Sequence, residues 1–408
     1  MLLQYEPRTM RILVVHNYYQ KRGGEDTNRE AEMQLLREAG HEVVEYTRHN
    51  NDILGFTPFA KAKLGLDTIW ANRTYQELGR IIRSTAPTVV HFHNTFPLVS
   101  PSAYYTCERA GVPVVQTLHN YRLLCPNGLF FREGQPCEDC LGRSVPWPGV
   151  VHRCYRGSLA ASGAVAAMLA VHRSMKTWTI QVDMYIALTE FARRKFVEGG
   201  LPTERIAVKP NFAAHDPGAK RRTGEYSLYV GRLSEEKGPQ VLLKAWARLG
   251  GHVPLKLVGD GALREGLGRE TVAMGLKGVE LLGQVGSKEV VSLLQGACFL
   301  VLPSVCYENF PLTIAEAFAC GVPVIASRLG AIAEIVADGK TGLHFTAGDE
   351  ADLAAKVEWA WTHPKEMEEM GRAARREYEA KYTAGKNYEM LMEIYERALR
   401  ASRQVDGN

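Results

Sequence analysis

A chain of 408 residues is long enough for two domains, because single hydrophobic cores stop growing at roughly 250–300 residues. Its hydrophobic fraction of 46% and charged fraction of 23% are those of a folded globular protein, which excludes a disordered or fibrous chain. The net charge of +4 is small and no nucleic-acid-binding module is visible, so we expect no nucleic acid among its partners.

Buried strands and helices alternate along the first half of the chain. Residues before Met10 indicate a short tail, and RILVVH indicates the first strand, followed by a helix at about 26–39 and the strand HEVVEY. A longer helical region extends to Arg83. Alternation of this kind predicts a parallel sheet covered by helices on both faces. Further elements are expected at PTVVHFH, a helix near 102–110, VPVVQTLH, DMYIALT and RIAVKPN.

The first strand is followed by a loop with two adjacent glycines. NYYQKRGGED lacks the G-x-G-x-x-G spacing of a dinucleotide-binding fold. Gly23 and Gly24 still allow the backbone to approach a ligand closely. The loop therefore indicates either a ligand-facing segment or a flexible surface turn.

Four cysteines share one long loop with the spacing C-x11-C-x2-C-x13-C. Four thiols with one C-x2-C pair would suit a structural zinc ion, and free thiols without a metal are the alternative that the spacing leaves open. We expect no disulfides, because the cytoplasm is reducing. The loop cysteines are Cys125, Cys137, Cys140 and Cys154, whereas Cys107, Cys298, Cys306 and Cys320 fall in apolar elements and indicate core positions.

Basic residues gather in one stretch of the first half. They could contact anionic lipid or a lipid-diphosphate acceptor, but a solvated helix face is the interpretation that we favour. No apolar stretch reaches the ~20 residues of a membrane span and no leader is visible, so we expect a cytoplasmic location, with peripheral contact at the inner membrane face as the alternative. The basic residues are Arg153, Arg156, Arg173, Lys176, Arg193, Arg194 and Lys195.

The second half begins after residues 211–224, whose polar and basic composition indicates a linker. YSLYVGRLSEEKG then indicates a strand, a glycine turn and a helix, with Arg232 and Lys237 at the turn. Arginine offers a planar fork for phosphate oxygens and lysine a compact point charge, so the pair suits a diphosphate. The next strands, PLKLVGDGA and VELLGQV, place Val258, Gly259 and Gln284 where backbone groups would meet a nucleobase edge.

Two carboxylates, Glu308 and Glu316, flank a strand-to-helix junction in PSVCYENFPLTIAEAFACGVP. Pro311 stands where a first helical residue is expected, so the free N–H groups of Leu312 and Thr313 would form an anion site at the helix start. The carboxylate before the turn suits a sugar, the amides at the turn suit a diphosphate, and the carboxylate after the turn suits a ribose diol. An ordinary junction with both carboxylates solvated is the alternative.

The order G-R-L-x-x-x-K-G, V-G-D-G and E-x7-E resembles the retaining, nucleotide-sugar-dependent glycosyltransferases of family 4. The likeness covers nearly the whole chain and is most specific from residue 226 to about 345. It implies the GT-B fold, an α/β architecture of two Rossmann-like, doubly wound parallel-sheet domains that face an interdomain cleft. The first domain would hold residues 1–215 and a C-terminal crossover helix at 387–408, and the second would hold residues 216–386.

The resemblance also assigns roles. The implied activity is transfer of a hexose from a UDP- or GDP-sugar to a saccharide, lipid-linked or small-molecule acceptor, with surface polysaccharide or glycolipid synthesis as the expected pathway class. Gly23 and Gly24 would face the donor diphosphate, and Glu316 would accept the ribose hydroxyls. Catalytic residues would be His119, Glu308, Arg232 and Lys237, with the amides of Asn309, Phe310 and Leu312 assisting.

His119 ends a strand and therefore faces the same crevice, and its family counterpart lies near the donor sugar. A structural strand-end histidine is the alternative, and it is the interpretation that we give to His16, His91 and His93. The chain departs from the family at Pro311, where glycine is frequent, so one amide contact to the sugar is lost.

No D-x-D pattern occurs, so we expect no divalent cation at the donor diphosphate. Two other functions stay open at this point. A nicotinamide-dependent oxidoreductase could use the same kind of sheet, although the dinucleotide motif is missing. A non-catalytic scaffold could bind a partner through the cysteine loop.

Overall fold

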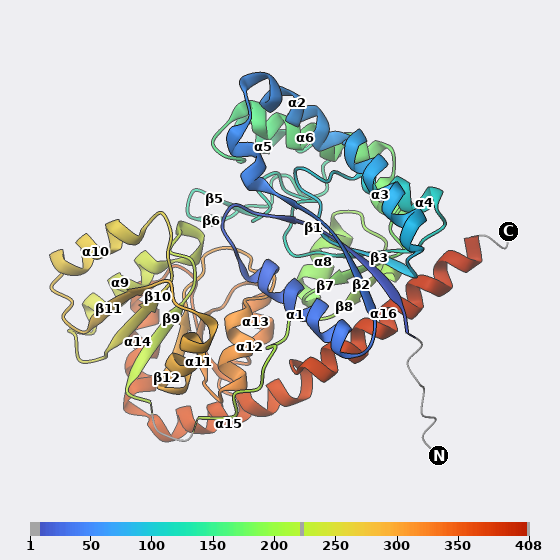
Figure 1. The fold of residues 1–408 in the computed structure, drawn as a ribbon. Coiled ribbons are helices and arrows are strands. Elements are labelled where there is room, and N and C mark those ends of the chain that lie inside the picture. Colours follow the sequence, from blue (N-terminus) through green and yellow to red (C-terminus); the bar gives the residue numbers. More distant parts are fainter. Residues whose placement is uncertain (1–8, 221–223, 406–408) are drawn as a thin grey trace, which may run out of the picture.

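The computed structural model describes residues 9–220 and 224–405. It has two six-stranded parallel sheets, each with helices on both faces, which confirms the predicted fold class (Figure 1). The expected tail before Met10 falls on residues 1–8, outside the described part, as do residues 221–223 of the expected linker.

The first sheet has the strand order β2-β1-β3-β4-β7-β8. Neighbouring residues of its strands alternate between two cores: Leu13 and Val15 face one, and Ile12 and Val14 face the other. A strand buried on both faces explains the continuous apolar runs of the sequence. The strands are β1 (Arg11–Tyr18), β2 (Glu42–His49), β3 (Val89–Asn94), β4 (Val114–Thr117), β7 (Met184–Ala187) and β8 (Ile206–Val208).

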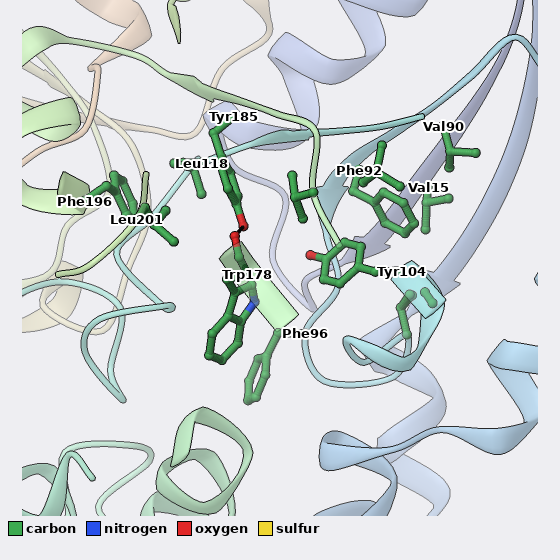
Figure 2. Packing of buried hydrophobic residues seen from close by; sticks show 14 of the residues in the cluster. Val15, Val90, Phe92, Phe96, Tyr104, Leu118, Trp178, Tyr185, Phe196 and Leu201 are labelled. Atoms are coloured by element: carbon green, nitrogen blue, oxygen red, sulfur yellow. Dashed lines mark hydrogen bonds between the residues drawn. The ribbon is translucent and has the colours of Figure 1, made fainter. Parts of the chain in front are cut away.

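One face of this sheet packs against aromatic and aliphatic side chains from several helices. The ring of Phe92 meets Tyr104 edge to face at 4.8 Å between centroids, and the Tyr185 hydroxyl donates to the Trp178 carbonyl at 2.7 Å (Figure 2). The buried Tyr185 hydroxyl thus finds an acceptor. The first-half helices are α1 (Gly24–Glu38), α2 (Pro58–Ile69), α3 (Asn72–Thr85), α4 (Ser102–Arg109), α5 (Trp147–Val151), α6 (Leu159–Ser174), α7 (Thr177–Ile180) and α8 (Glu190–Glu198).

The second sheet has the strand order β11-β10-β9-β12-β13-β14. In chain order this is 3-2-1-4-5-6, the doubly wound order that opens a crevice where it reverses, between β9 and β12. The strands are β9 (Tyr226–Val230), β10 (Leu255–Val258), β11 (Val279–Gly283), β12 (Ala297–Leu302), β13 (Val324–Ser327) and β14 (Gly342–Phe345). Its helices are α9 (Pro239–Arg248), α10 (Arg264–Ala273), α11 (Ser287–Gln295), α12 (Leu312–Ala319), α13 (Gly330–Ile335), α14 (Glu350–Thr362) and α15 (Pro364–Lys381).

The last helix, α16 (Ala384–Val405), leaves the second sheet and lies along the first (Figure 1). Its residues Leu391, Ile394, Tyr395 and Ala398 recur at helical spacing and enter the core shared by α1 and the first sheet. We therefore propose that the domain boundary lies near residue 215 and that α16 belongs to the first domain. Residues 382–383 separate α16 from α15.

Few residues between β4 and α6 are in regular structure. Besides α5 they form a short antiparallel hairpin of β5 (Phe131–Arg132) and β6 (Gln135–Pro136). This segment carries the four loop cysteines. Within the described ranges, no helix combines the length and the hydrophobicity that crossing a bilayer requires.

The packing of α16 can be tested by truncating its most central side chain. Leu391 is fully buried, so Leu391→Ala is expected to lower the free energy of unfolding by about 2–5 kcal/mol through lost burial and the cavity left behind. Urea unfolding measures this change. Glu393→Ala, at an exposed position of the same helix, is the control and should stay within about 0.5 kcal/mol of the wild type. Equal stabilities of both variants would contradict the docking of α16 on the first sheet.

Candidate active site between the two sheets

A cavity of about 570 Å³ lies between the two sheets, which we call the interdomain cavity. Its walls come from the loops after β1 and β4 on one side and after β9 to β12 on the other. Parallel strands end at the same edge of a sheet, so these loops converge. The structure brings together at this cavity the predicted residues Gly23, Gly24, His119, Arg232, Lys237, Val258, Gly259, Gln284, Glu308, Asn309, Phe310, Leu312 and Thr313.

Two glycines allow the loops of the second domain that line the cavity to pack closely against one another. Gly238 has a φ of 68°, and a β-carbon there would lie 2.0 Å from the carbonyl oxygen of Pro303. Gly259 has a φ of 143°, and its β-carbon would lie 1.9 Å from the carbonyl oxygen of Gly231. Any larger residue at either position would push the loops after β9, β10 and β12 apart.

Lys237 and Glu308 face each other across the crevice of the second sheet. Lys237 Nζ lies 2.6 Å from Glu308 Oε1, and Ser304 Oγ donates to the same oxygen at 2.7 Å. Burial opposes the charge on Lys237, but Glu308 outweighs it, so the pKa of Lys237 lies above its ordinary value. The lysine therefore stays cationic beside a fixed carboxylate.

Arg232 is held more loosely than Lys237. Its guanidinium reaches Glu236 only at 3.8 Å, and about half of its side chain is exposed. A β-carbon at Gly23 would lie 3.7 Å from Arg232 Nη2, so the glycine loop of the first domain approaches this cation directly. A planar cation with free donors is thus available to an anion in the cavity.

The start of α12 differs by one position from the expectation. Pro311 is the N-cap in extended conformation, not the first helical residue, and it has no side chain that could cap the helix. Within the described residues the N–H groups of Leu312 and Thr313 have no acceptor, as predicted for an open anion site.

The turn at residues 308–310 is bonded to the first domain. Asn309 Nδ2 donates to the Leu118 carbonyl at 2.9 Å, and the Tyr121 hydroxyl donates to the Glu308 carbonyl at 3.3 Å. These contacts place the Glu308 turn next to the end of β4, where His119 lies. The interdomain cavity therefore depends on both domains for its shape.

Glu316 is not among the residues that line the interdomain cavity, and its contact with the ribose hydroxyls stays a prediction. It lines a neighbouring cavity of about 410 Å³, which shares Arg22 and Leu312 with the interdomain cavity. Burial raises the pKa of Glu316 to about 7, and its carboxylate has no hydrogen bond to any described residue. The two predicted carboxylates thus face different spaces on either side of the start of α12.

Sequence reasoning missed Glu25, which lines the interdomain cavity directly after Gly24. Its Oε1 is inaccessible to solvent and has no hydrogen-bond partner. Burial, with Asp26 adding to it, raises the pKa of Glu25 to about 8. Adjacency to the glycine pair was the available clue, because the first turn of α1 begins there.

The predicted basic cluster is divided by its local contacts. Lys195 pairs with Glu138 at 2.8 Å, and Arg194 reaches Glu334 at 3.8 Å. Arg173 donates to the carbonyls of Leu123 and Arg143. Arg153, Arg156, Lys176 and Arg194 are exposed, and contact of the basic residues with lipid stays a prediction.

The four loop cysteines line one small cavity. Burial and the neighbouring Cys125 raise the pKa of Cys140 to about 12. Among the described residues, however, Glu32, His91 and His93 form the one set of three potential ligands whose atoms lie within 4.8 Å of one another. The thiols are close neighbours but stand further apart than a shared zinc ion requires, so zinc stays a prediction.

Metal analysis tests the zinc prediction. If the thiols close on a zinc ion, freshly purified protein should carry about one zinc per chain, and Cys137→Ser with Cys140→Ser should abolish it. Cys298→Ser, at a partly buried position outside the loop, is the matched control and should retain the metal. Metal-free protein from zinc-supplemented cultures would rule the site out.

Family models and characterised relatives match both halves of the chain. The model for glycosyl transferases group 1 matches residues 212–377, and the model for glycosyltransferase family 4 matches residues 32–216. The D-rhamnosyltransferase WbpZ of Pseudomonas aeruginosa is 35% identical over 161 residues, which is 39% of this chain and 42% of that protein. The glycogen synthase of Mycobacterium tuberculosis is 29% identical over 360 residues, 87% of this chain and 78% of that protein.

Solved structures share the fold. HepE from Anabaena, in complex with UDP and glucose, superposes with a TM-score of 0.67 at 17% identity and covers 94% of this chain and 98% of its own. Sucrose-phosphate synthase from Thermosynechococcus elongatus gives a TM-score of 0.72 at 16% identity, over 96% and 100%. Because the two family models meet at residues 212–216 and between them span residues 32–377, the chain belongs to the family 4 glycosyltransferases, with the GT-B fold.

Proposed function

We propose that this glycosyltransferase moves a hexose from a UDP- or GDP-sugar to a hydroxyl of a saccharide, lipid-linked or small-molecule acceptor, with retention of anomeric configuration. One observation carries the proposal. Arg232, Lys237 and the open amides of α12 converge on one cavity, opposite the glycine loop of the first domain. Two cations and a helix start suit a diphosphate better than any neutral ligand.

The departing nucleoside diphosphate develops negative charge, and the second domain offsets it with groups that are already in place. Lys237 is fixed by Glu308, and Arg232 is free to turn toward a phosphate. The amides of Leu312 and Thr313 add the partial positive charge of a helix N-terminus. Pre-organised donors of this kind are usually the largest catalytic contribution. With this countercharge supplied by the chain itself, we propose transfer that does not require a divalent cation.

The sugar of the donor would lie between Glu308 and His119. Glu308 accepts from Lys237 and Ser304 through Oε1, so its second oxygen is available to sugar hydroxyls. The amides of Asn309 and Phe310 stand beside it in the cavity wall. Val258, Gly259 and Gln284 line the part of the cavity that we assign to the nucleobase.

Retention is proposed through attack by the acceptor on the face from which the diphosphate departs. This scheme needs no enzyme nucleophile, only a leaving group that stays held beside the incoming hydroxyl. The acceptor would enter from the first domain, where His119 and Glu25 line the cavity. Synthesis of a surface polysaccharide or a glycolipid is the pathway class that we favour.

Arg232 provides the sharpest test of the diphosphate site. Arg232→Ala removes a half-exposed side chain, so the fold should persist while kcat for transfer or hydrolysis of the preferred nucleotide sugar falls about 100- to 1000-fold. The donor is first found by thermal unfolding with a panel of nucleotide sugars, since a ligand at 100 times its Kd stabilises by ~2.7 kcal/mol.

Lys244→Ala is the matched control for Arg232→Ala. Lys244 is an exposed cation on α9 outside the interdomain cavity, and its removal should leave turnover near the wild-type rate. An Arg232→Ala enzyme as active as the control would contradict the diphosphate site, and a wild-type protein without turnover of any nucleotide sugar would contradict the function.

Glu316 gives a prediction in pH. Its pKa is raised from its ordinary value near 4.5 to about 7, so the folded chain holds a proton that the unfolded chain releases. Stability is therefore lost as pH rises from about 4.5 to 7, by up to about 3 kcal/mol. Glu316→Gln removes this loss and should raise the free energy of unfolding at pH 8 but not at pH 4.5. Urea unfolding without ligand at both pH values measures the free energy of unfolding of the variant and of the wild type. The same difference between the two proteins at both pH values would show that Glu316 titrates normally.

A further inference from the structure

A line of buried polar side chains runs from the interior of the first domain to His119. His93, at the end of β3, places Nδ1 at 2.9 Å from His119 Nε2, and the two rings are stacked. Glu32 of α1 places Oε1 at 3.5 Å from His93 Nε2. Its other oxygen accepts from Lys209 Nζ at 2.6 Å. His93, Glu32 and Lys209 are each at most 3% exposed, and the mechanism proposed above uses none of them.

Glu32 and His93 face each other with unused hydrogen-bonding capacity. Glu32 Oε1 and His93 Nε2 are both buried without a formal hydrogen bond to any described residue. Leaving a buried donor or acceptor unpaired costs free energy. Glu32 Oε1 and His93 Nε2 lie 3.5 Å apart, so a hydrogen bond between them would satisfy both atoms. A small adjustment of either side chain would complete the bond.

His91 also approaches Glu32, but its nitrogens are engaged elsewhere. Its Nδ1 lies 3.4 Å from Glu32 Oε1, yet it bonds the Tyr395 hydroxyl at 2.8 Å, and Nε2 bonds the Thr117 hydroxyl at 2.8 Å. A metal ion among Glu32, His91 and His93 would compete with these bonds and with the ammonium of Lys209 on the same carboxylate. The set therefore fits a hydrogen-bonded line better than a metal centre.

The charge of Glu32 determines the direction of every bond toward the cavity. A carboxylate that pairs with Lys209 only accepts, so the proton between Glu32 and His93 belongs to His93 Nε2. A neutral imidazole carries one N–H, so His93 Nδ1 accepts and His119 Nε2 donates. Burial holds the pKa values of His93 and His119 well below the ordinary range, which keeps both rings neutral near pH 7. His119 Nδ1 is then left without a proton, and it has no hydrogen bond to a described residue.

We propose that Glu32 and His93 are positioning residues that hold His119 in its Nε2–H tautomer, so that the nitrogen offered to the interdomain cavity is an acceptor for a sugar hydroxyl. This inference rests on the proposed function only for the identity of the ligand. The tautomer itself is a property of the chain without ligand. A positioning group behind a site histidine fixes both its ring orientation and its proton.

Glu32→Gln reverses donor and acceptor in each hydrogen bond between residue 32 and His119, and it keeps nearly the same side-chain shape. The Gln amide would accept from Lys209 through its oxygen and donate to His93 Nε2 through its nitrogen. His93 Nδ1 then carries the proton, His119 Nε2 accepts, and the N–H of His119 moves to Nδ1. We expect kcat for the preferred nucleotide sugar to fall about 10- to 100-fold, as for loss of other supporting partners of a site histidine, with a smaller change in KM.

Long-range ¹⁵N–¹H spectra of histidine-labelled protein without ligand report the tautomer of each ring, and His119→Asn identifies the His119 signals. The expected result is Nε2–H for His119 in the wild type and Nδ1–H in Glu32→Gln. His91→Gln is the matched control, because His91 approaches the same Glu32 oxygen but does not bond His119, and it should leave the His119 tautomer unchanged.

Wild-type His119 with the proton on Nδ1, or the same tautomer in Glu32→Gln, would overturn the proposal. If Glu32→Gln does not fold, the wild-type spectrum alone decides, because it already shows which nitrogen carries the proton. Failure of the proposed function is a separate outcome: the expected tautomers with no turnover of any nucleotide sugar would support the positioning and contradict the transfer.

Discussion

The reversal of strand order between β9 and β12 is the constraint on which the active site depends. Connections leave these two neighbouring strands in opposite directions, so the loops beyond them part and leave a crevice. Lys237 enters the crevice from one loop and Glu308 from the other, and their ion pair at 2.6 Å joins the two sides. The pair is partly buried, so each charge needs the other, and the lysine to which we assign diphosphate binding is already placed when a ligand arrives.

The first domain completes this crevice through contacts that are themselves structural. The turn at residues 308–310 is bonded to Leu118 and Tyr121, directly beside His119. Helix α16 returns from the second domain to the first sheet, and Asn387 on it accepts from Lys209, which also holds Glu32. The packing of α16, the hydrogen bonds between the domains and the line of polar side chains behind His119 are therefore connected, and a defect in any of them would alter the cavity.

Short-range features of this fold could be predicted from the sequence, and features set by helix geometry could not. Arg232 and Lys237 share one glycine turn, so spacing alone placed both at the cavity. Glu316 comes four residues after Leu312, one turn and about 6 Å further along α12, which carries its carboxylate past the interdomain cavity to the neighbouring one. The contact of His93 with His119 joins residues 26 apart on adjacent strands, and only the sheet register brings them together. The spacing of the cysteines likewise predicted their shared loop but not the separation of their sulfur atoms.

Four glutamates, Glu25, Glu32, Glu308 and Glu316, divide into two groups by their partners. Glu32 and Glu308 each hold a lysine at 2.6 Å and act as fixed charges. Glu25 and Glu316 have at least one oxygen without a partner, and burial raises their pKa values to about 8 and about 7. An unpaired buried carboxyl costs stability, and such a cost persists where a ligand supplies the missing donors. Hydroxyl donors would favour the ionised form, so ligand binding at either residue would release a proton. Glu25 lines the interdomain cavity and Glu316 the neighbouring one, so the missing donors would come from ligands in two adjoining spaces.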